Sequence, residues 1–367
     1  ARRSLGRSGV AGRAMRILML LVCGMLLALP VRAGVERLEP ANWWVGMRHD
    51  RVQLMVHGPG IATASARIDR PGVRVLEVAR GDSPNYLFVT VHVQPDAAPG
   101  AVPIAFLRDG RTIAIHPWRI DAREAGSAQR RGFDARDAIY LITPDRFANG
   151  DPSNDSLPGL RQAADRANPG GRHGGDLAGI RQQLDYIAGM GFTQIWPTPF
   201  LENDQPDYSY HGYAITDLYK TDPRMGRNED VAALSREAKA KGIGLVMDIV
   251  LNHIGSRHWW MADLPEHDWI NHGGRFVPTS HRRTTVQDPY AAPADRAAFT
   301  DGWFVDAMPD LNQRNPRLAR YLIQHTLWWI ESAGLSGIRE DTFGYADAGV
   351  LSAWAKAVQD EYPGFSI

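Results

Sequence analysis

The sequence has 367 residues and a formal net charge of zero, and 44% of the residues are hydrophobic and 22% charged. This composition is that of a soluble globular protein with two or three domains, and the balanced charge argues against a nucleic-acid partner or an anionic membrane surface. Only one cysteine is present, Cys23, which excludes a disulfide within the chain.

The first 33 residues have the pattern of a secretory signal. Arg16 supplies a positive start, residues 17–29 form an apolar run, and small residues end the segment at Ala33. The run is too short to span a membrane comfortably. Residues 1–14 are rich in arginine and precede Met15, so they are either an extended start of the signal or untranslated sequence. We expect cleavage and export to the periplasm or the medium; an uncleaved membrane anchor is the alternative.

Residues 34–120 are predicted to form a β-sandwich. Short segments rich in β-branched residues are separated by Pro, Gly, Asp and Asn turns at the regular spacing typical of sandwiches. The segments expected as strands are 52–56, 73–78, 86–93 and 112–115. Residues 121–136 are polar and contain Gly126 and Gly132, which predicts a linker.

From residue 137 onward, strands and helices alternate, which predicts right-handed βαβ units around a parallel sheet. The expected strands are 138–142, 193–196, 244–250 and 335–341, with the start of a fifth at 365–367. The expected helices are 177–187, capped by Asp176; 228–242, capped by Asn228; 318–332; and 346–361. An open doubly wound sheet and a (β/α)8 TIM barrel both fit this alternation.

Polar side chains gather where the expected strands end, and they favour the barrel. They are Asp145, Trp196, Asp248 with Asn252 and His253, and Arg339 with Asp341. Functional residues at the carboxyl ends of several strands are typical of a barrel's active face, and no glycine-rich phosphate loop follows the first strand. Because a barrel takes about 250 residues, we expect residues 137–367 to hold only about half of one, the first four to five β/α units.

The segment 337–342 carries a cation and a carboxylate on one face of a strand. In an extended chain Arg339 and Asp341 point the same way and Glu340 points the opposite way. A neighbouring cation favours the ionised carboxylate, which suits a nucleophile or an electrostatic stabiliser but not a general acid. Glu340 is expected to face the surrounding helices, where an unpaired carboxylate is costly.

Two polar motifs near the other strand ends have a structural explanation beside a functional one. Asp248 and His253 either satisfy each other's hydrogen bonds or belong to a site. The loop 210–217 contains His211 and Tyr213. An aromatic ring and a histidine suit sugar recognition, and the alternative is a loop with a packed tyrosine.

Residues 149–155, together with 174–176, are dense in the oxygen ligands that calcium prefers, but composition alone favours an ordinary turn. Residues 254–316 are far too many for a plain strand-to-helix loop and predict a small inserted domain. Several large aromatic residues are expected to form the core of this insertion: Trp259, Trp260, Trp269, Trp303 and Phe304.

Taken in chain order, these motifs resemble one family. The segment 137–367 resembles the α-amylase superfamily, glycoside hydrolase family 13. Residues 248–253 look like its first conserved region, 337–341 like its second and 308–312 (Met-Pro-Asp-Leu-Asn) like its fifth. Residues 35–120, which include Asn42-Trp43-Trp44 and Asp82-Ser83-Pro84, are similar to the N-terminal domain of the neopullulanase and cyclomaltodextrinase branch.

This resemblance implies a role for each matching residue. Asp341 is the nucleophile that forms a covalent glycosyl-enzyme, and Arg339 orients it. His211, Tyr213 and His253 line the sugar subsite, with the Tyr213 ring stacked on the sugar. Asp248 and Asn252 are structural at the site. The resemblance also reverses the turn interpretation above and implies a calcium site made by Asn149, Asp151, Asn154, Asp155, Gly174 and Asp176.

The resemblance implies retaining hydrolysis of α-glucans at α-1,4 bonds, with α-1,6 bonds as a second candidate linkage, in starch, pullulan, maltooligosaccharides or cyclodextrins. The family's general acid follows the fifth strand, so we expect it beyond Ile367 and expect this chain to be a C-terminally truncated, inactive fragment. A non-catalytic glucan-binding protein and a transglycosylase on the same fold are the alternatives. The resemblance also implies a homodimer.

Overall fold

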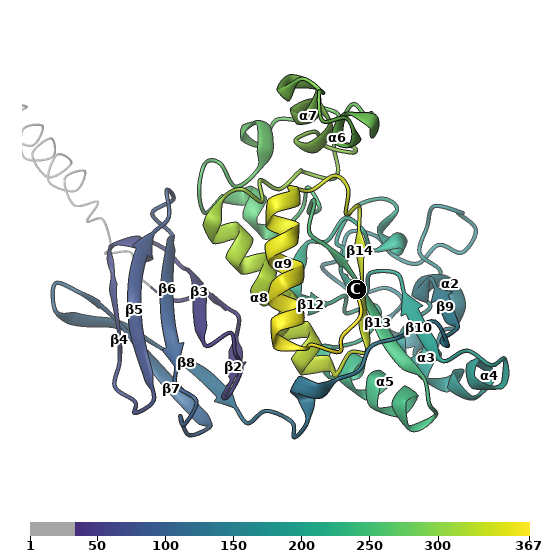
Figure 1. The fold of residues 1–367 in the computed structure, drawn as a ribbon, viewed down its shortest axis with the longest axis horizontal. Helices are drawn as coiled ribbons and strands as arrows, with labels where there is room; N and C mark the ends of the chain where they lie inside the picture. Colours follow the sequence, from purple (N-terminus) through teal and green to yellow (C-terminus); the bar gives the residue numbers. More distant parts are fainter. Residues whose placement is uncertain (1–33) are drawn as a thin grey trace, which may run out of the picture.

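The computed structural model describes residues 34–367, and the expected signal lies outside the described residues (Figure 1). The chain forms a β-sandwich followed by a larger domain in which strands and helices alternate. Within residues 34–367, no helix is long and apolar enough to cross a membrane.

The sandwich that the sequence predicted consists of two four-stranded sheets, so four of its eight strands were not among the expected segments. One has the order β1(Arg37–Glu39), β3(Arg51–His57), β6(Tyr86–Val93), β5(Val73–Arg80). The other has the order β2(Asn42–Trp44), β8(Arg111–Asp121), β7(Gly100–Arg108), β4(Ser65–Ile68). The four segments expected as strands correspond to β3, β5, β6 and β8. Strand β6 is buried along almost its whole length, because one face lies on the sandwich core and the other meets the second domain.

The second domain is built on a curled parallel sheet. Its strands are β9(Ile139–Ile142), β10(Gln194–Pro197), β13(Gly244–Val250) and β14(Gly337–Asp341), which neighbour one another in chain order. A doubly wound sheet reverses its strand order at a switch point, whereas a barrel does not. Ser366 forms a parallel bridge to Gly337, so the expected fifth strand begins beside β14. The sheet is therefore the first part of a barrel.

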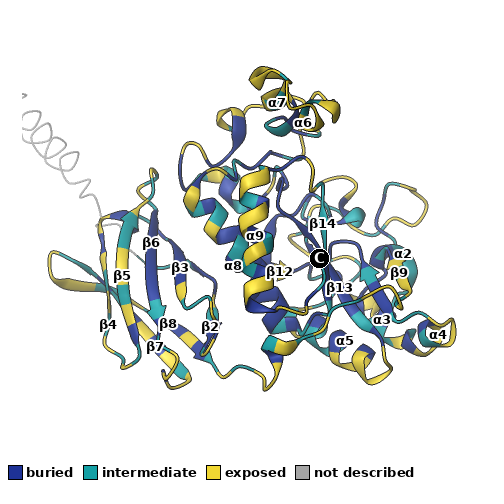
Figure 2. Cartoon of the chain, viewed as in Figure 1, coloured by how far each residue is buried: buried dark blue, intermediate teal, exposed yellow. Residues whose placement is uncertain are grey.

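The longer helices lie outside this sheet and turn exposed residues to solvent (Figure 2). Outside the insertion 254–316, the α-helices of this domain are α2(Pro144–Phe147), α3(Leu177–Gln182), α4(Leu184–Gly189), α5(Asn228–Ala240), α8(Pro316–Ala333) and α9(Ala348–Glu361). A short antiparallel pair, β11(Leu201–Glu202) and β12(Asp217–Thr221), lies between β10 and α5.

Two expectations about the helices need correction. The single helix expected over 177–187 is broken at Gln183 into α3 and α4, although Asp176 does cap it by accepting a hydrogen bond from Gly179 N at 2.6 Å. Asn228 is not the cap of α5 but its first residue, and its Oδ1 accepts from Thr221 N at 2.9 Å instead. At Asn228, the hydrogen bond with the preceding strand β12 thus replaced the expected helix cap.

The insertion 254–316 contains α6(Thr284–Gln287) and α7(Pro293–Thr300). Three of its tryptophans contact one another as expected, but they also pack outside the insertion. Trp259 stacks on Tyr86 of the sandwich, with ring centroids 6.0 Å apart, and Trp269 lies 6.0 Å from Phe88. Trp260 packs edge-on against a tyrosine of α8. These rings bury their area between the insertion, the sandwich and α8.

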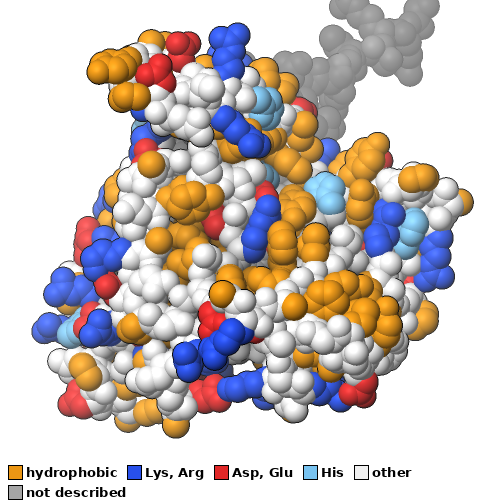
Figure 3. Space-filling model, turned by 45° about the vertical axis from the view of Figure 1, so that its right-hand side comes forward, with side chains coloured by type: hydrophobic (Ala, Val, Ile, Leu, Met, Phe, Trp, Pro, Cys, Tyr) orange, Lys and Arg blue, Asp and Glu red, His pale blue; other side chains and the backbone are white. Residues whose placement is uncertain are grey.

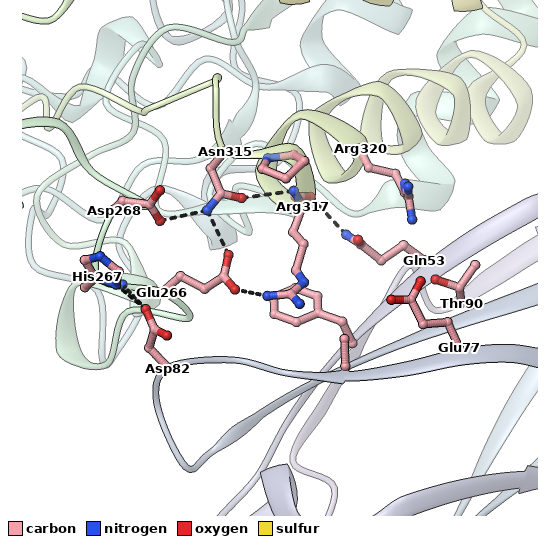
Figure 4. Close-up of a pocket in the computed structure, with 13 residues that line it drawn as sticks. Gln53, Glu77, Asp82, Thr90, Glu266, His267, Asp268, Asn315, Arg317 and Arg320 are labelled. Atoms are coloured by element: carbon pink, nitrogen blue, oxygen red, sulfur yellow. Dashed lines mark hydrogen bonds and ion pairs between the residues drawn. The ribbon is translucent and has the colours of Figure 1, made fainter.

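A hollow of about 470 Å³ lies along this seam between the sandwich and the second domain (Figure 4). Glu266 pairs with Arg317 and accepts a hydrogen bond from Asn315 Nδ2 at 2.8 Å. His267 pairs with Asp82 of the sandwich. The Glu266 pairs lie within the second domain, whereas the His267–Asp82 pair and the hydrogen bond from Gln53 Nε2 to Arg317 O at 2.9 Å cross the seam.

Candidate active site

Two neighbouring strands of the curled sheet, β13 and β14, bring charged side chains to one point. In the parallel register, Asp248 of β13 lies beside Arg339 of β14. The Arg339 Nη1 atom is 2.6 Å from Asp341 Oδ1 and 3.1 Å from Asp248 Oδ1. The expected pairing of Arg339 with Asp341 on one strand face is therefore present, and the same guanidinium also serves Asp248.

Asp248 is the buried hub of this cluster. Its Oδ2 accepts hydrogen bonds from Trp196 Nε1 and from the Tyr213 hydroxyl, both at 3.0 Å. Burial raises the pKa of Asp248 to about 6, and the positive charge of Arg339 opposes that rise. Because its oxygens are occupied by these donors, Asp248 is suited to hold Arg339 and Tyr213 in place.

His253 does not pair with Asp248, so the mutual satisfaction considered for these two residues does not occur. Burial lowers the pKa of His253 to about 4, which keeps the imidazole neutral at physiological pH. Within the described chain its Nε2 atom has no hydrogen-bond partner. A buried neutral imidazole with a free nitrogen is suited to bind a sugar hydroxyl.

His211 and Tyr213 lie together on the turn 208–213, which we call the sugar turn. Tyr213 N donates to His211 Nδ1 at 2.9 Å, and the two rings are 5.8 Å apart. Burial lowers the pKa of His211, so it too is neutral. The Tyr213 hydroxyl is committed to Asp248, which fixes the plane of the ring. The structure thus brings the predicted sugar-binding residues to the same end of the sheet as the charged cluster.

Asn252 is held by a hydrogen bond to Asp310. Asp310 belongs to the motif 308–312, but no role was assigned to it from the sequence. Asn252 Nδ2 donates to one Asp310 oxygen at 3.0 Å, and Asn271 Nδ2 donates to the other at 2.7 Å. Burial raises the pKa of Asp310 to about 8. The backbone of Asp310 also bridges to His253, so the insertion and the end of β13 are fastened together here.

Phe304 borders the candidate site, which sequence reasoning missed because it assigned this residue to the core of the insertion. Its ring lies 5.5 Å from His253 and 4.6 Å from Tyr345, which follows β14. It therefore adds an apolar wall to the site from the insertion. Only the position of Phe304 shortly before the motif 308–312 could have indicated this.

Glu340 points away from Asp341, as its place in the strand predicts. Its Oε1 accepts a hydrogen bond from Leu251 N at 3.2 Å, and its buried Oε2 has no partner within residues 34–367. Burial raises the pKa of Glu340 well above its usual range, so the carboxyl group is neutral. Protonation reduces the cost that the sequence predicted for a carboxylate at this position.

The open side of the curled sheet is a hollow of about 670 Å³ next to the charged cluster. It is lined mainly by apolar side chains, together with Arg339, Glu340 and Gln359. Figure 3 shows apolar patches with charged groups between them on the face that it brings forward. The apolar residues with large exposed surface here are Ile139, Phe343 and Ile367.

The predicted calcium ligands lie on residues 149–176, which we call the cation loop. Asp176 does not have free oxygens, because it accepts from Gly150 N, Asp151 N and Asn154 Nδ2 at 2.9–3.0 Å as well as capping α3. Asp151 is exposed and its Oδ1 accepts from a serine hydroxyl. These two carboxylates shape the loop.

Other groups on the cation loop do fit a cation. The buried Oδ1 atoms of Asn149 and Asn154 lack partners among the described residues. Gly174 has φ of 87° and lies so close to Asp155 that a Cβ atom would be 2.5 Å from Asp155 Oδ1. No three His, Cys, Asp or Glu side chains of residues 34–367 converge on one point. A cation here would be held mainly by amide, carbonyl and single carboxylate oxygens, which is the ligand set of calcium.

Comparison with known proteins identifies both domains. The family model described as the α-amylase catalytic domain matches residues 141–360, and the model of the cyclomaltodextrinase N-terminal domain matches residues 37–124.

Individual relatives agree with these matches. The chain is 33% identical over 230 residues to a β/α-amylase of Paenibacillus polymyxa, covering 61% of this chain and 18% of that protein. It is 32% identical to neopullulanase 2 of Thermoactinomyces vulgaris, covering 61% of this chain and 37% of that one. The crystal structure of a Geobacillus thermoleovorans α-amylase with acarbose superposes with a TM-score of 0.52 at 34% identity, covering 62% of this chain and 45% of that chain. The chain thus spans less than half the length of each.

Proposed function

Since this chain belongs to the α-amylase family, glycoside hydrolase family 13, and carries the N-terminal domain of its cyclomaltodextrinase and neopullulanase branch, we propose that it acts on α-glucans through a covalent glycosyl-Asp341 intermediate. The observation that carries this proposal is the 2.6 Å contact between Arg339 Nη1 and Asp341 Oδ1 at the carboxyl end of β14. Neopullulanase and cyclomaltodextrinase are the names of relatives.

In the proposed reaction, an ionised Asp341 oxygen attacks the anomeric carbon while the bond to the leaving sugar oxygen breaks. Arg339 aims the Asp341 carboxylate, and Asp248 keeps Arg339 in place. The Tyr213 ring covers the apolar face of the sugar, and His253 Nε2 binds one of its hydroxyls. Water then releases the sugar from Asp341.

Retaining hydrolysis also needs a protonated carboxyl group about 5–5.5 Å from the nucleophile to give its proton to the leaving oxygen. Asp248 is engaged with three donors, and Glu340 lies on the opposite face of β14. We therefore propose that the acid is not among residues 34–367, and that this chain binds glucans but does not cleave unactivated ones unaided.

We also propose that the cation loop holds calcium through Asn149, Asn154, Asp155 and the Gly174 carbonyl, with Asp151 and Asp176 shaping the loop. Bound calcium would neutralise the loop's carboxylate charge and fasten its two ends together. We also propose that the segment 15–33 directs export of the protein and that the chain forms a homodimer. Sedimentation of the purified chain tests the homodimer, and N-terminal sequencing of the exported protein tests the cleavage.

An activated substrate tests the nucleophile without the acid, because fluoride leaves without protonation. The chain is incubated with a 5-fluoro-α-maltosyl fluoride, and its intact mass and peptides are measured. We expect one glycosyl adduct on Asp341, none in Asp341→Asn, and an unchanged adduct in Asp69→Asn, an exposed residue of the sandwich. The Kd of the Asp341→Asn variant for maltoheptaose should lie within about threefold of the Kd of the unaltered chain.

The same experiment separates the alternatives. Binding of maltoheptaose without any adduct would favour a non-catalytic glucan-binding protein. If the chain neither binds maltoheptaose nor becomes labelled at Asp341, the proposed function is refuted.

A further inference from the structure

Arg146, on the short helix α2, joins three parts of the chain that the sequence separates. Its Nε donates to Asp145 Oδ2 at 2.9 Å, and its Nη2 donates to the carbonyls of Pro169 and Gly171, both at 2.8 Å. Its guanidinium carbon lies 3.9 Å from the centre of the Tyr210 ring, a close cation–π contact. One side chain thus touches α2, the cation loop and the sugar turn.

Asp145 extends this connection into the cation loop. It is buried, and its carboxylate accepts hydrogen bonds from His173 N at 2.8 Å and Gly174 N at 3.2 Å, while its carbonyl accepts from Gly175 N at 2.9 Å. The end of the cation loop is therefore fixed to α2. Since Arg146 shares the same carboxylate, the position of its guanidinium depends on the order of the loop.

The sugar turn has little internal support. Tyr208 and Gly212 have φ of 55° and 87°, so a non-glycine residue at one end is in the left-handed region. Between them, residues Ser209–His211 form a single 3-10 turn. Such a turn keeps its shape only if its surroundings hold it.

Those surroundings come from the cation loop. A Cβ atom at Gly170 would lie 2.7 Å from Tyr208 Cε1, so the Tyr208 ring packs directly on the loop backbone. Ser209 N donates to Gln162 Oε1 at 2.8 Å. Together with the Arg146–Tyr210 contact, these interactions hold three consecutive residues of the sugar turn from one side.

The far end of the turn carries the sugar-binding groups. The Tyr210 ring meets His211 edge-on at 5.8 Å, and His211 accepts the hydrogen bond from Tyr213 N. Tyr213 in turn is fixed to Asp248 through its hydroxyl. A displacement of Tyr210 would therefore be passed to both sugar-binding rings through direct contacts.

We propose that Arg146 is a positioning residue, which holds the sugar turn in its binding shape by clamping Tyr210 to the cation loop. This inference rests on the proposed function, because it assigns Arg146 a part in glucan binding. Arg146 does not touch the reacting atoms; it acts through Tyr210 and His211.

The test compares Arg146→Met, which keeps the length of the side chain but removes its charge and donors, with Arg146→Lys, which keeps the charge. Maltoheptaose binding is measured by calorimetry. We expect the Kd to rise about tenfold in Arg146→Met and by a smaller factor in Arg146→Lys. At saturating glycosyl fluoride, the rate of Asp341 labelling should stay within about twofold of the unaltered chain, because bound substrate restores the turn.

The matched control is Arg136→Met, which replaces an exposed arginine whose side chain pairs, among residues 34–367, with Asp134 alone. The Kd of this variant for maltoheptaose should not change. The inference is overturned if the Arg146→Met variant folds and its Kd for maltoheptaose is unchanged. It is also overturned if the variant is labelled more slowly at Asp341 but keeps its affinity. If Arg146→Met does not fold, Arg146→Lys and Tyr210→Leu decide, since either variant binding as tightly as the unaltered chain refutes the clamp. Absence of maltoheptaose binding by the unaltered chain instead refutes the proposed function.

Discussion

The Nη1 atom of Arg339 lies 2.6 Å from Asp341 Oδ1 and 3.1 Å from Asp248 Oδ1, so one cation compensates two carboxylates of which Asp248 is fully buried. This sharing explains how a buried charge is tolerated beside the candidate nucleophile. It also ties the position of Asp341 to that of a residue on the neighbouring strand.

Replacing Arg339 by Met should therefore leave Asp248 buried without its cation. We expect the free energy of unfolding to fall by about 3 kcal/mol at neutral pH. This is the lower end of the range for removing one partner of a buried ion pair, because Arg339 is partly exposed. The loss should shrink in acid, where Asp248, with a pKa of about 6 even beside Arg339, becomes protonated. Urea unfolding at two pH values measures this. Arg119→Met, which removes an exposed pair, is the control; an equal loss at both pH values would contradict the explanation.

Asp310 should make stability depend on pH. Its pKa of about 8 in the folded chain is above its ordinary value of 3.8, so the folded state keeps a proton that the unfolded state has lost. Stability is then greatest below the unfolded value and falls as pH rises towards 8, by at most about 1.4 kcal/mol per unit. Asp310→Asn should flatten this slope, whereas Asp69→Asn, at an exposed position, should not. Parallel slopes in the unaltered chain and Asp310→Asn would refute the prediction.

Tyr321 of α8 joins the second domain to the sandwich, because its hydroxyl donates to Glu39 Oε2 at 2.7 Å and both residues are buried. Tyr321→Phe should leave a buried carboxyl oxygen without this donor and lower the free energy of unfolding by about 1–3 kcal/mol. Tyr290→Phe removes a hydroxyl from a ring that is 93% exposed and should have almost no effect. Chemical denaturation followed by fluorescence compares the two variants. Equal stabilities would show that this contact does not fasten the domains.

Chelation tests the proposed cation loop. If calcium binds the folded chain alone, saturating calcium should add about 2.7 kcal/mol of stability at a hundredfold excess over its Kd, and EGTA should remove it. Scanning calorimetry with calcium and with EGTA measures the shift in Tm. Asp155→Asn should lower or abolish the shift, and Asp69→Asn should retain it. A Tm that is insensitive to EGTA would remove calcium from the proposal.

Much of the fold could be predicted from short-range patterns. Residues 244–250 form a buried strand because the run is nearly all apolar, and Arg339 and Asp341 share a face because side chains alternate in a strand. The motifs at the strand ends identified the charged cluster and the sugar turn. The helical spacing did not predict the break at Gln183, where the backbone leaves the helical conformation, and the capping preference did not predict that the Asn228 side chain would bond to Thr221 N instead of capping α5.

The sequence by itself determined the β-sandwich, the parallel β/α domain, the family resemblance and the face of β14 on which Asp341 lies. All of these depend on periodicity or on residues close together in the chain. Only the tertiary structure decided that Trp259 and Trp269 pack on the sandwich, that Phe304 borders the site, and that Arg146 reaches Tyr210. These contacts join residues 51 to 181 positions apart, and they depend on how the strands curl and the loops close, which local pattern does not encode.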